Sequence, residues 1–319
     1  MLEFNIGYAQ QHAFLPLRNM GEFLNIPPHA LLLYDSMGKY NWTSQGGNFS
    51  NPLALLEQTH RGVTQRLSVN HRTQIKLSSS LRLGVTAGMN TVLFDETTAT
   101  PIISQRPGAS VTGSANFGSN AIRNWSVEPQ LEYKPLLRGE WKLDFLAGAS
   151  LQASNSKSST ISGTGYNNDA LLKSLAGAGN ITASNDKSEY RYQAAFFRGN
   201  LRWKDHWLMN ITARRDGSSR FGPNKRFANF GAAGLGWIFS KEPWLLENKT
   251  LSFGKIRASY GVTGSDQIRN YQYLDSWIGL NNPYQGTAGL RPNKLYNPDY
   301  SWEQIRKFET GIELGFLRI

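Results

Sequence analysis

The sequence has no cysteine, and its five histidines are scattered without the close spacing that metal sites use. A disulfide framework, a thiolate metal site and a cysteine nucleophile are therefore excluded. The sequence also lacks the G-x-S-x-G elbow, the H-E-x-x-H helix, the Walker A loop and the dinucleotide fingerprint. We therefore predict that the protein is not an enzyme and has no catalytic residue, no metal and no cofactor.

Long apolar runs are missing as well. No segment has the roughly 18 consecutive apolar residues that a membrane helix needs, and the first residues do not form a signal peptide. The mean hydropathy of −0.44 is typical of a soluble protein. Membrane proteins that cross the bilayer with strands are an exception, because alternating lipid-facing and lumen-facing residues give their strands a polar mean hydropathy.

The charge is basic without any basic arm. The 34 basic and 23 acidic residues give a formal net charge of +11, which fits a nucleic-acid partner, an anionic membrane surface or a solvated basic face. The cations alternate with apolar residues along the whole chain, and no run of five occurs. A nucleic-acid binder is therefore the last-ranked hypothesis, and we predict no nucleic-acid partner.

Apolar and polar residues alternate with a period of two over most of the chain, which indicates strands. One example is the apolar series Leu81, Leu83, Val85, Ala87 and Met89, separated by Arg82, Gly84, Thr86 and Gly88. The pattern predicts an all-β antiparallel meander of about ten long strands. Their expected ranges are 2–10, 64–75, 80–91, 121–134, 140–152, 189–203, 207–216, 226–239, 250–263 and 301–316.

The links between these strands alternate in length. The segments KLSSS, KPLLRGE and KDH are tight, whereas 11–63, 92–120, 153–188 and 264–300 are long and polar. The links at 217–225 and 240–250 are intermediate, and 166–179 is expected to form a short helix inside its loop. Short turns on one rim and long loops on the other are typical of an outer-membrane β-barrel.

The stretch ARRDGSSRFGPNKRFANFGAAGLGWIF, residues 213–239, reads as two neighbouring strands joined by a loop on the long-loop rim. We expect Trp207 and Trp237 to lie at the opposite, short-turn end, in an interfacial aromatic girdle. The other expected lipid-facing side chains there are Met209, Ile211, Ala213, Leu235 and Phe239. The candidate lumen-facing side chains are Arg198, Asn200, Arg202, Asn210, Thr212 and Arg214.

Several segments resemble one known family. NPLALLEQTHRG, SVEPQLEY, GTGYNNDALLKSLAGA, RRDGSSRFGPNKRF, GWIFSKEPWL, KIRASYGVTGS and NPDYSWEQIRKFETGIELGF look like the barrel of SusC/RagA-type TonB-linked outer-membrane transporters of Bacteroidetes. The resemblance is clearest over residues 51–319. Residues 1–319 are then expected to be part of one barrel domain, open and incomplete, because transporters of this class have 22 strands.

The resemblance implies a bacterial outer-membrane protein that imports glycan fragments or peptides. It also implies outer-membrane lipid around the barrel, a SusD-like lipoprotein lid over the external loops, and energy from the TonB–ExbB–ExbD complex. The signal peptide, the TonB box and the plug of such transporters are not expected within this chain.

Aromatic residues gather in the loop at 264–300. Tyr271, Tyr273, Trp277 and Tyr284 are candidates for stacking on sugar rings or contacting peptide, and ordinary loop packing is the alternative reading. An alternative function is a soluble or surface-displayed β-sheet protein that binds glycans. That hypothesis predicts aromatics buried between two sheets.

Overall fold

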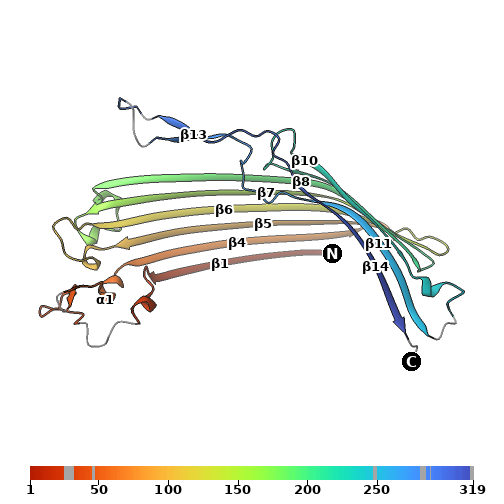
Figure 1. Ribbon diagram of the computed structural model, residues 1–319, viewed down its shortest axis with the longest axis horizontal. Helices are drawn as coiled ribbons and strands as arrows, with labels where there is room; N and C mark the ends of the chain where they lie inside the picture. The colour runs from red at the N-terminus through yellow and green to blue at the C-terminus, as the bar shows by residue number, and fades with distance from the viewer. Residues whose placement is uncertain (25–31, 45–46, 247–249, 281–284, 288, 317–319) are drawn as a thin grey trace.

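A computed structural model describes residues 1–24, 32–44, 47–246, 250–280, 285–287 and 289–316. Ten strands form one antiparallel sheet in the order β1-β4-β5-β6-β7-β8-β9-β10-β11-β14 (Figure 1). The expected meander of ten long strands is confirmed. Its strands are β1 (Leu2–Pro16), β4 (Thr59–Lys76), β5 (Leu81–Thr100), β6 (Gly113–Tyr133), β7 (Trp141–Tyr166), β8 (Asn180–Trp203), β9 (Trp207–Ser218), β10 (Phe227–Trp237), β11 (Leu251–Ser265) and β14 (Glu303–Phe316).

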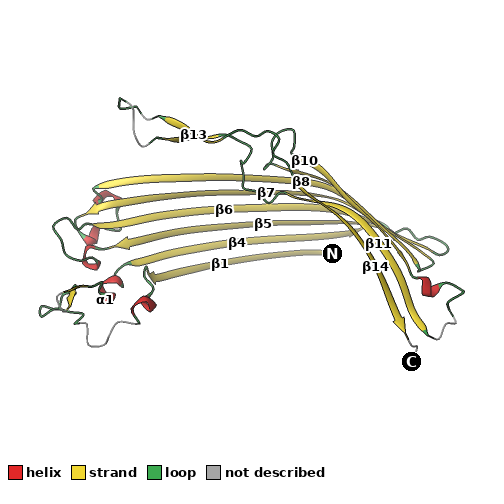
Figure 2. Cartoon of the chain, in the orientation of Figure 1, coloured by secondary structure: helices red, strands yellow, loops and turns green. Residues whose placement is uncertain are grey.

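The remaining elements are short and lie in the links (Figure 2). Two small hairpins pair β2 (Thr43–Ser44) with β3 (Gly47–Asn48), and β12 (Ser276–Gly279) with β13 (Leu290–Lys294). One turn of α-helix, α1, spans Pro52–Leu55. The 3-10 turns are η1 (Met20–Phe23), η2 (Ile102–Ser104), η3 (Asp169–Leu171), η4 (Leu175–Gly177) and η5 (Phe239–Lys241).

The sheet is open and encloses little. Among the described residues, β1 and β14 each pair with one neighbour only, so both edges are free. The chain exposes 21698 Å², whereas a compact protein of 35.7 kDa exposes about 13,000 Å². The compact two-sheet packing that the soluble alternative requires is therefore absent from the described part of the chain, and the expectation of an open antiparallel sheet is confirmed.

The segments 92–120 and 153–188 were expected to be loops but are largely strand, so the neighbouring strands are longer than predicted. Residues 92–100 extend β5, residues 113–120 begin β6, and most of 153–188 belongs to β7 and β8. The β7–β8 register runs without a shift from Trp141↔Trp203 to Thr164↔Asn180. Residues such as Ser156–Thr160 are polar on both faces, so the period-of-two signal vanishes there although the backbone pairing continues.

The helix expected at 166–179 is not formed. The segment contains the separate 3-10 turns η3 and η4 instead. Asp169 does not extend a helix. Its carboxylate instead accepts hydrogen bonds from the backbone of Ile102 and Ile103, at 2.6 and 3.2 Å, and ties two neighbouring links together. Tyr166 and Leu172 are buried in the small core beneath them.

The links alternate between two rims, as expected, but they do not sort strictly by length, because 238–250 on one rim is as long as 167–179 on the other. One rim carries 17–58, 101–112, 167–179, 219–226 and 266–302, and the other carries 77–80, 134–140, 204–206 and 238–250. We call these the long-link rim and the short-link rim. Figure 1 shows α1 at the long-link rim and the β13 hairpin projecting away from the short-link rim. Phe239, expected to be in a strand, begins η5 instead.

Candidate functional site

The register divides the side chains of the sheet into two unlike faces, because directly paired residues share a face and alternate residues share it along a strand. Asn200↔Asn210 and Trp203↔Trp207 are such pairs, one on each face. We call the first the polar face and the second the apolar face. Large exposed side chains of the apolar face include Phe4, Ile6, Met89, Trp125, Leu131, Phe197, Met209, Leu235, Ile256, Phe308 and Ile312.

A row of four tryptophans crosses the apolar face next to the short-link rim. Trp141 stacks on Trp203 with ring centroids 5.9 Å apart, and Trp207 stacks on Trp237 at 5.2 Å. The central pair, Trp203 and Trp207, is opposed across β8 and β9. The expected positions of Trp207 and Trp237 at the short-link end are therefore confirmed. From this row to Ala195 the apolar face extends eight residue steps along β8, about 27 Å.

The six candidate lumen-facing residues all lie together on the polar face, on β8 and β9. Asn210 donates a hydrogen bond to the amide oxygen of Asn200 at 2.5 Å. The Thr212 hydroxyl accepts one from the backbone of Ala232 at 3.1 Å, which joins β9 to β10. Asn200, Asn210 and Thr212 thus satisfy one another and the backbone, while two of the arginines remain exposed.

Arg214 is the best-held cation of this group. Its guanidinium donates to Asp216 at 2.6 Å and to the Tyr192 hydroxyl at 2.5 Å, and it lies 5.5 Å from the centroid of the Phe196 ring. Asp216 is almost fully buried, so the ion pair fixes Arg214 in position. In the described part of the chain, Arg198 and Arg202 make neither an ion pair nor a hydrogen bond.

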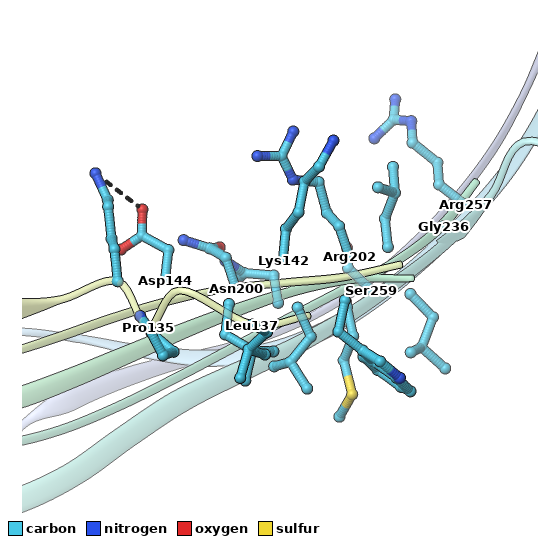
Figure 3. Close-up of a pocket in the computed structure, with 18 of the residues that line it drawn as sticks. Pro135, Leu137, Lys142, Asp144, Asn200, Arg202, Gly236, Arg257 and Ser259 are labelled. Atoms are coloured by element: carbon cyan, nitrogen blue, oxygen red, sulfur yellow. Dashed lines mark hydrogen bonds and ion pairs between the residues drawn. The ribbon is translucent and has the colours of Figure 1, made fainter. Parts of the chain in front are cut away.

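Further charges collect on the polar face near the short-link rim, beside a hollow of about 1070 Å³. Figure 3 shows Lys142, Arg202 and Arg257 pointing to the same side of the sheet. The Lys142 ammonium binds Asp205 in the neighbouring turn at 2.6 Å. Asp144 pairs with the Lys134 ammonium at 3.5 Å, marked by the dashed line in Figure 3. The charged residues that line the hollow are six cations and one anion, Asp144, so its lining is mainly cationic.

At the long-link rim, Asp266 joins strands and links in a network that the sequence pattern did not reveal. Its carboxylate accepts hydrogen bonds from the Tyr190 hydroxyl at 2.7 Å and from the Ser218 hydroxyl at 2.8 Å. Arg220 donates to the Asp266 carbonyl at 2.7 Å and to Asn270 at 3.0 Å. The same guanidinium lies 4.2 Å from the centroid of the Tyr190 ring. The 266–302 link is thereby fastened to β8 and β9.

Aromatic packing fastens the same link a second time. Phe221, in the 219–226 link, is fully buried, and its ring centroid lies 4.9 Å from that of Trp302. The Trp302 indole donates to the Arg226 carbonyl at 3.1 Å. Gly222 approaches Pro298 so closely that a Cβ would lie 2.2 Å from the Pro298 carbonyl oxygen. The motifs RFGPN and NPDYSW, far apart in sequence, are thus two halves of one contact.

The candidate loop aromatics separate in the structure. The Tyr271 hydroxyl accepts a hydrogen bond from the Glu189 backbone at 2.7 Å, where β8 continues beyond the end of β9. Tyr271 and Tyr273 share a hollow of about 650 Å³ whose other lining residues come mostly from the apolar-face side. Trp277 lies apart on β12 and is 57% exposed. Tyr284 lies outside the described residues. Contact of these side chains with a substrate stays a prediction.

Within the described residues, no three histidine, aspartate or glutamate side chains gather as metal ligands. None of the helices described there is long and apolar enough to cross a membrane.

Comparison with known proteins gives a consistent picture. A family model described as TonB dependent receptor-like, beta-barrel matches residues 17–318. TonB-dependent receptor P3 of Formosa agariphila is 26% identical over 293 residues, which are 89% of this chain and 29% of that protein. TonB-dependent receptor SusC of Bacteroides thetaiotaomicron is 34% identical over 130 residues, covering 38% of this chain and 13% of SusC.

A solved structure of the RagAB peptide transporter shares the fold, with a TM-score of 0.77 at 21% identity over 99% of this chain and 37% of the RagAB chain. The chain spans less than a third of the length of TonB-dependent receptor P3 and of SusC. Since the family match extends over nearly all of the sequence, the protein belongs to the family of TonB-dependent receptor-like β-barrels.

Proposed function

We propose that this chain is part of the barrel wall of a bacterial outer-membrane transporter that imports nutrients by TonB-dependent uptake. The observation that carries the proposal is the contrast between the two sheet faces. The apolar face ends in a tryptophan row at the short-link rim, as lipid-facing barrel strands do. The polar face would then line the lumen, and the long-link rim would lie outside the cell.

The polar face supports passage of a polar substrate. Arg198 and Arg202 are exposed on β8, and Arg214 is held rigidly beside Tyr192. Guanidinium groups bind carboxylates and sugar hydroxyls well, so peptides and glycan fragments both suit this surface. A SusD-like lipoprotein lid over the long-link rim and energy from TonB–ExbB–ExbD complete the proposed mechanism. The likeness to SusC-type and RagA-type receptors supports both partners.

Membrane placement is tested by fluorescence quenching in the receptor that carries this chain, reconstituted in vesicles. Brominated lipids should quench tryptophans on the apolar face, and replacing Trp207 and Trp237 by Phe should remove much of that quenching. Replacing Trp277 by Phe is the control and should leave it unchanged. Equal quenching in all three proteins would contradict the membrane assignment.

Transport is tested in cells that depend on this receptor for growth on oligosaccharides or on peptides. An Arg198→Gln/Arg202→Gln variant should take up the nutrient about tenfold more slowly, because two lumenal cations are lost. Arg215→Gln/Arg306→Gln removes the same charge from the opposite face and is the control. A protonophore should abolish uptake, and uptake that persists without the proton gradient would contradict TonB dependence.

A further inference from the structure

The apolar face ends differently at its two rims. Next to the short-link rim it ends in the tryptophan row, whereas toward the long-link rim it is interrupted by cations on β6, β7 and β8, beyond which Phe117, Ile161 and Ile181 follow on the same face. Arg123, Lys157, Lys187 and Arg191 lie on the same face as Trp125, as the register shows. We call these four residues the cationic cluster. All four side chains are exposed.

The pairing inside the cationic cluster is unfavourable for the chain alone. Lys157 and Lys187 are direct partners across β7 and β8, which places their Cβ atoms about 5 Å apart. Like charges in that position repel. Glu189 is the one acidic residue between them in the described structure, and it pairs with Lys187 at 2.6 Å and with Arg191 at 3.9 Å. Four cations against one anion leave a net charge of +3, so the surface suits an external anion.

A hollow of about 650 Å³ lies between Arg191 of the cationic cluster and the apolar face. Trp125, Leu151 and Phe227 line it on the apolar side, and each is more than 40% exposed. Arg191, Glu189 and Tyr271 line its polar side. The Arg191 side chain is 79% exposed, so its guanidinium, 3.9 Å from the Glu189 carboxylate, is accessible to a ligand. The hollow therefore offers apolar contact and positive charge to one amphipathic molecule.

The same boundary continues on other strands. Arg61 on β4, Arg215 on β9 and Arg306 on β14 also belong to the apolar-face side. Each is followed, two residues nearer the short-link rim, by an apolar residue: Val63, Ala213 and Phe308. The boundary moves along the register from strand to strand, as strand tilt in a barrel requires. Cations thus border the apolar face on the long-link side of β4, β6, β7, β8, β9 and β14, whereas β5 carries Asp95 on that face.

From these observations we propose that the cationic cluster and the adjoining hollow bind the headgroup of a lipid that carries more than one phosphate, with its acyl chains on the apolar face. The cluster extends four residue steps along β8, about 14 Å, which exceeds the reach of a single phosphate. Lysine and arginine near a membrane surface attract anionic lipids. This inference rests on the proposed membrane function, because it takes the apolar face to be in contact with lipid.

The test is lipid binding by the receptor that carries this chain, purified in neutral detergent and titrated in native mass spectrometry. Cardiolipin, which has two phosphates, should bind at least tenfold more tightly than zwitterionic phosphatidylcholine. Lys157→Gln/Lys187→Gln should weaken cardiolipin binding about thirtyfold and leave phosphatidylcholine binding unchanged. The control, Lys173→Gln/Lys225→Gln, removes the same charge from two exposed links and should bind cardiolipin like the wild type.

Three outcomes would overturn the inference: equal affinity for the two lipids, an unchanged affinity in Lys157→Gln/Lys187→Gln, or an equal loss in the control variant. Inorganic phosphate is titrated in parallel, and its saturable binding at micromolar concentration would assign the cluster to a soluble anion instead. Failure of the proposed membrane function can be told apart from failure of the lipid site, because bromolipid quenching would then be absent. A quenched receptor without headgroup preference contradicts the lipid site alone.

Discussion

At the scale of single residues, Arg214 shows how a side chain on an open sheet is kept in one position. Its contacts with Asp216 and Tyr192 come from its own strand and the neighbouring strand. Arg214→Ala should lower the free energy of unfolding by about 1–2 kcal/mol, because Asp216 is then left buried without its partner. Asp216→Asn should cost less when it is added to the Arg214→Ala variant than when it is made in the wild type. Additive losses in a urea unfolding series would show that the pair is not coupled.

Gly222 is the second residue whose identity is dictated by a contact. A Cβ there would meet the Pro298 carbonyl oxygen at 2.2 Å, so Gly222→Ala should displace the 266–302 link and cost about 1–3 kcal/mol. Limited proteolysis should cleave that link faster in the variant. Gly279→Ala is the matched control, since a Cβ at Gly279 meets nothing within 4 Å. Equal cleavage rates in both variants would contradict the contact.

Replacement of Lys157 is expected to stabilise the chain, unlike the two substitutions above. Because it opposes Lys187 directly, Lys157→Glu should raise the free energy of unfolding by about 0.2–1 kcal/mol in neutral detergent. The gain should shrink at high salt, where charges on the surface are screened. Thermal unfolding at low and high sodium chloride measures both effects. A variant less stable than the wild type at low salt would mean that the two ammonium groups do not repel in the folded chain.

At the scale of elements, the 17–58 link carries its own pH dependence. The Tyr40 hydroxyl donates to the Glu57 carboxylate at 2.8 Å, and this hydrogen bond, helped by partial burial, raises the pKa of Tyr40 to about 12. The stabilisation is therefore fully present below pH 10 and is lost as the pH rises from about 10 to about 12. Absorbance at 295 nm should show a tyrosine component with a midpoint near pH 12 that is lost in Tyr40→Phe. An absorbance titration that Tyr40→Phe leaves unchanged near pH 12 would contradict the hydrogen bond.

The strands were predictable from sequence wherever their two faces differ, and only there. The apolar series around Leu83 and the row containing Trp207 gave both the strand and its face. Near Ser158 both faces are polar, so the signal ends while the strand continues to Tyr166. The same limit applies to the candidate site. Arg198 and Asn210 were found through alternation, whereas Asp266 is positioned by contacts between distant segments that no local pattern encodes.

At the scale of the whole molecule, the chain has an exposed apolar face and two free sheet edges among the described strands. Free edges and large apolar patches both promote association. The isolated chain should therefore self-associate in buffer and disperse in detergent micelles, which size-exclusion chromatography with light scattering can measure. A monodisperse monomer without detergent would contradict both the open sheet and the proposed membrane placement.

The strict chain order of the sheet has a consequence for how the molecule folds. Each strand from β4 to β11 pairs with the sheet strand before it in the sequence, across a link that is short for most pairs. The sheet can thus grow one hairpin at a time, with little loss of loop entropy at each step. The pairings of β1 with β4 and of β11 with β14 are different, since the 17–58 link and the 266–302 link must each close first. We expect β14 to dock last, once the contacts of Asp266 and Trp302 have brought the two ends of the 266–302 link closer together.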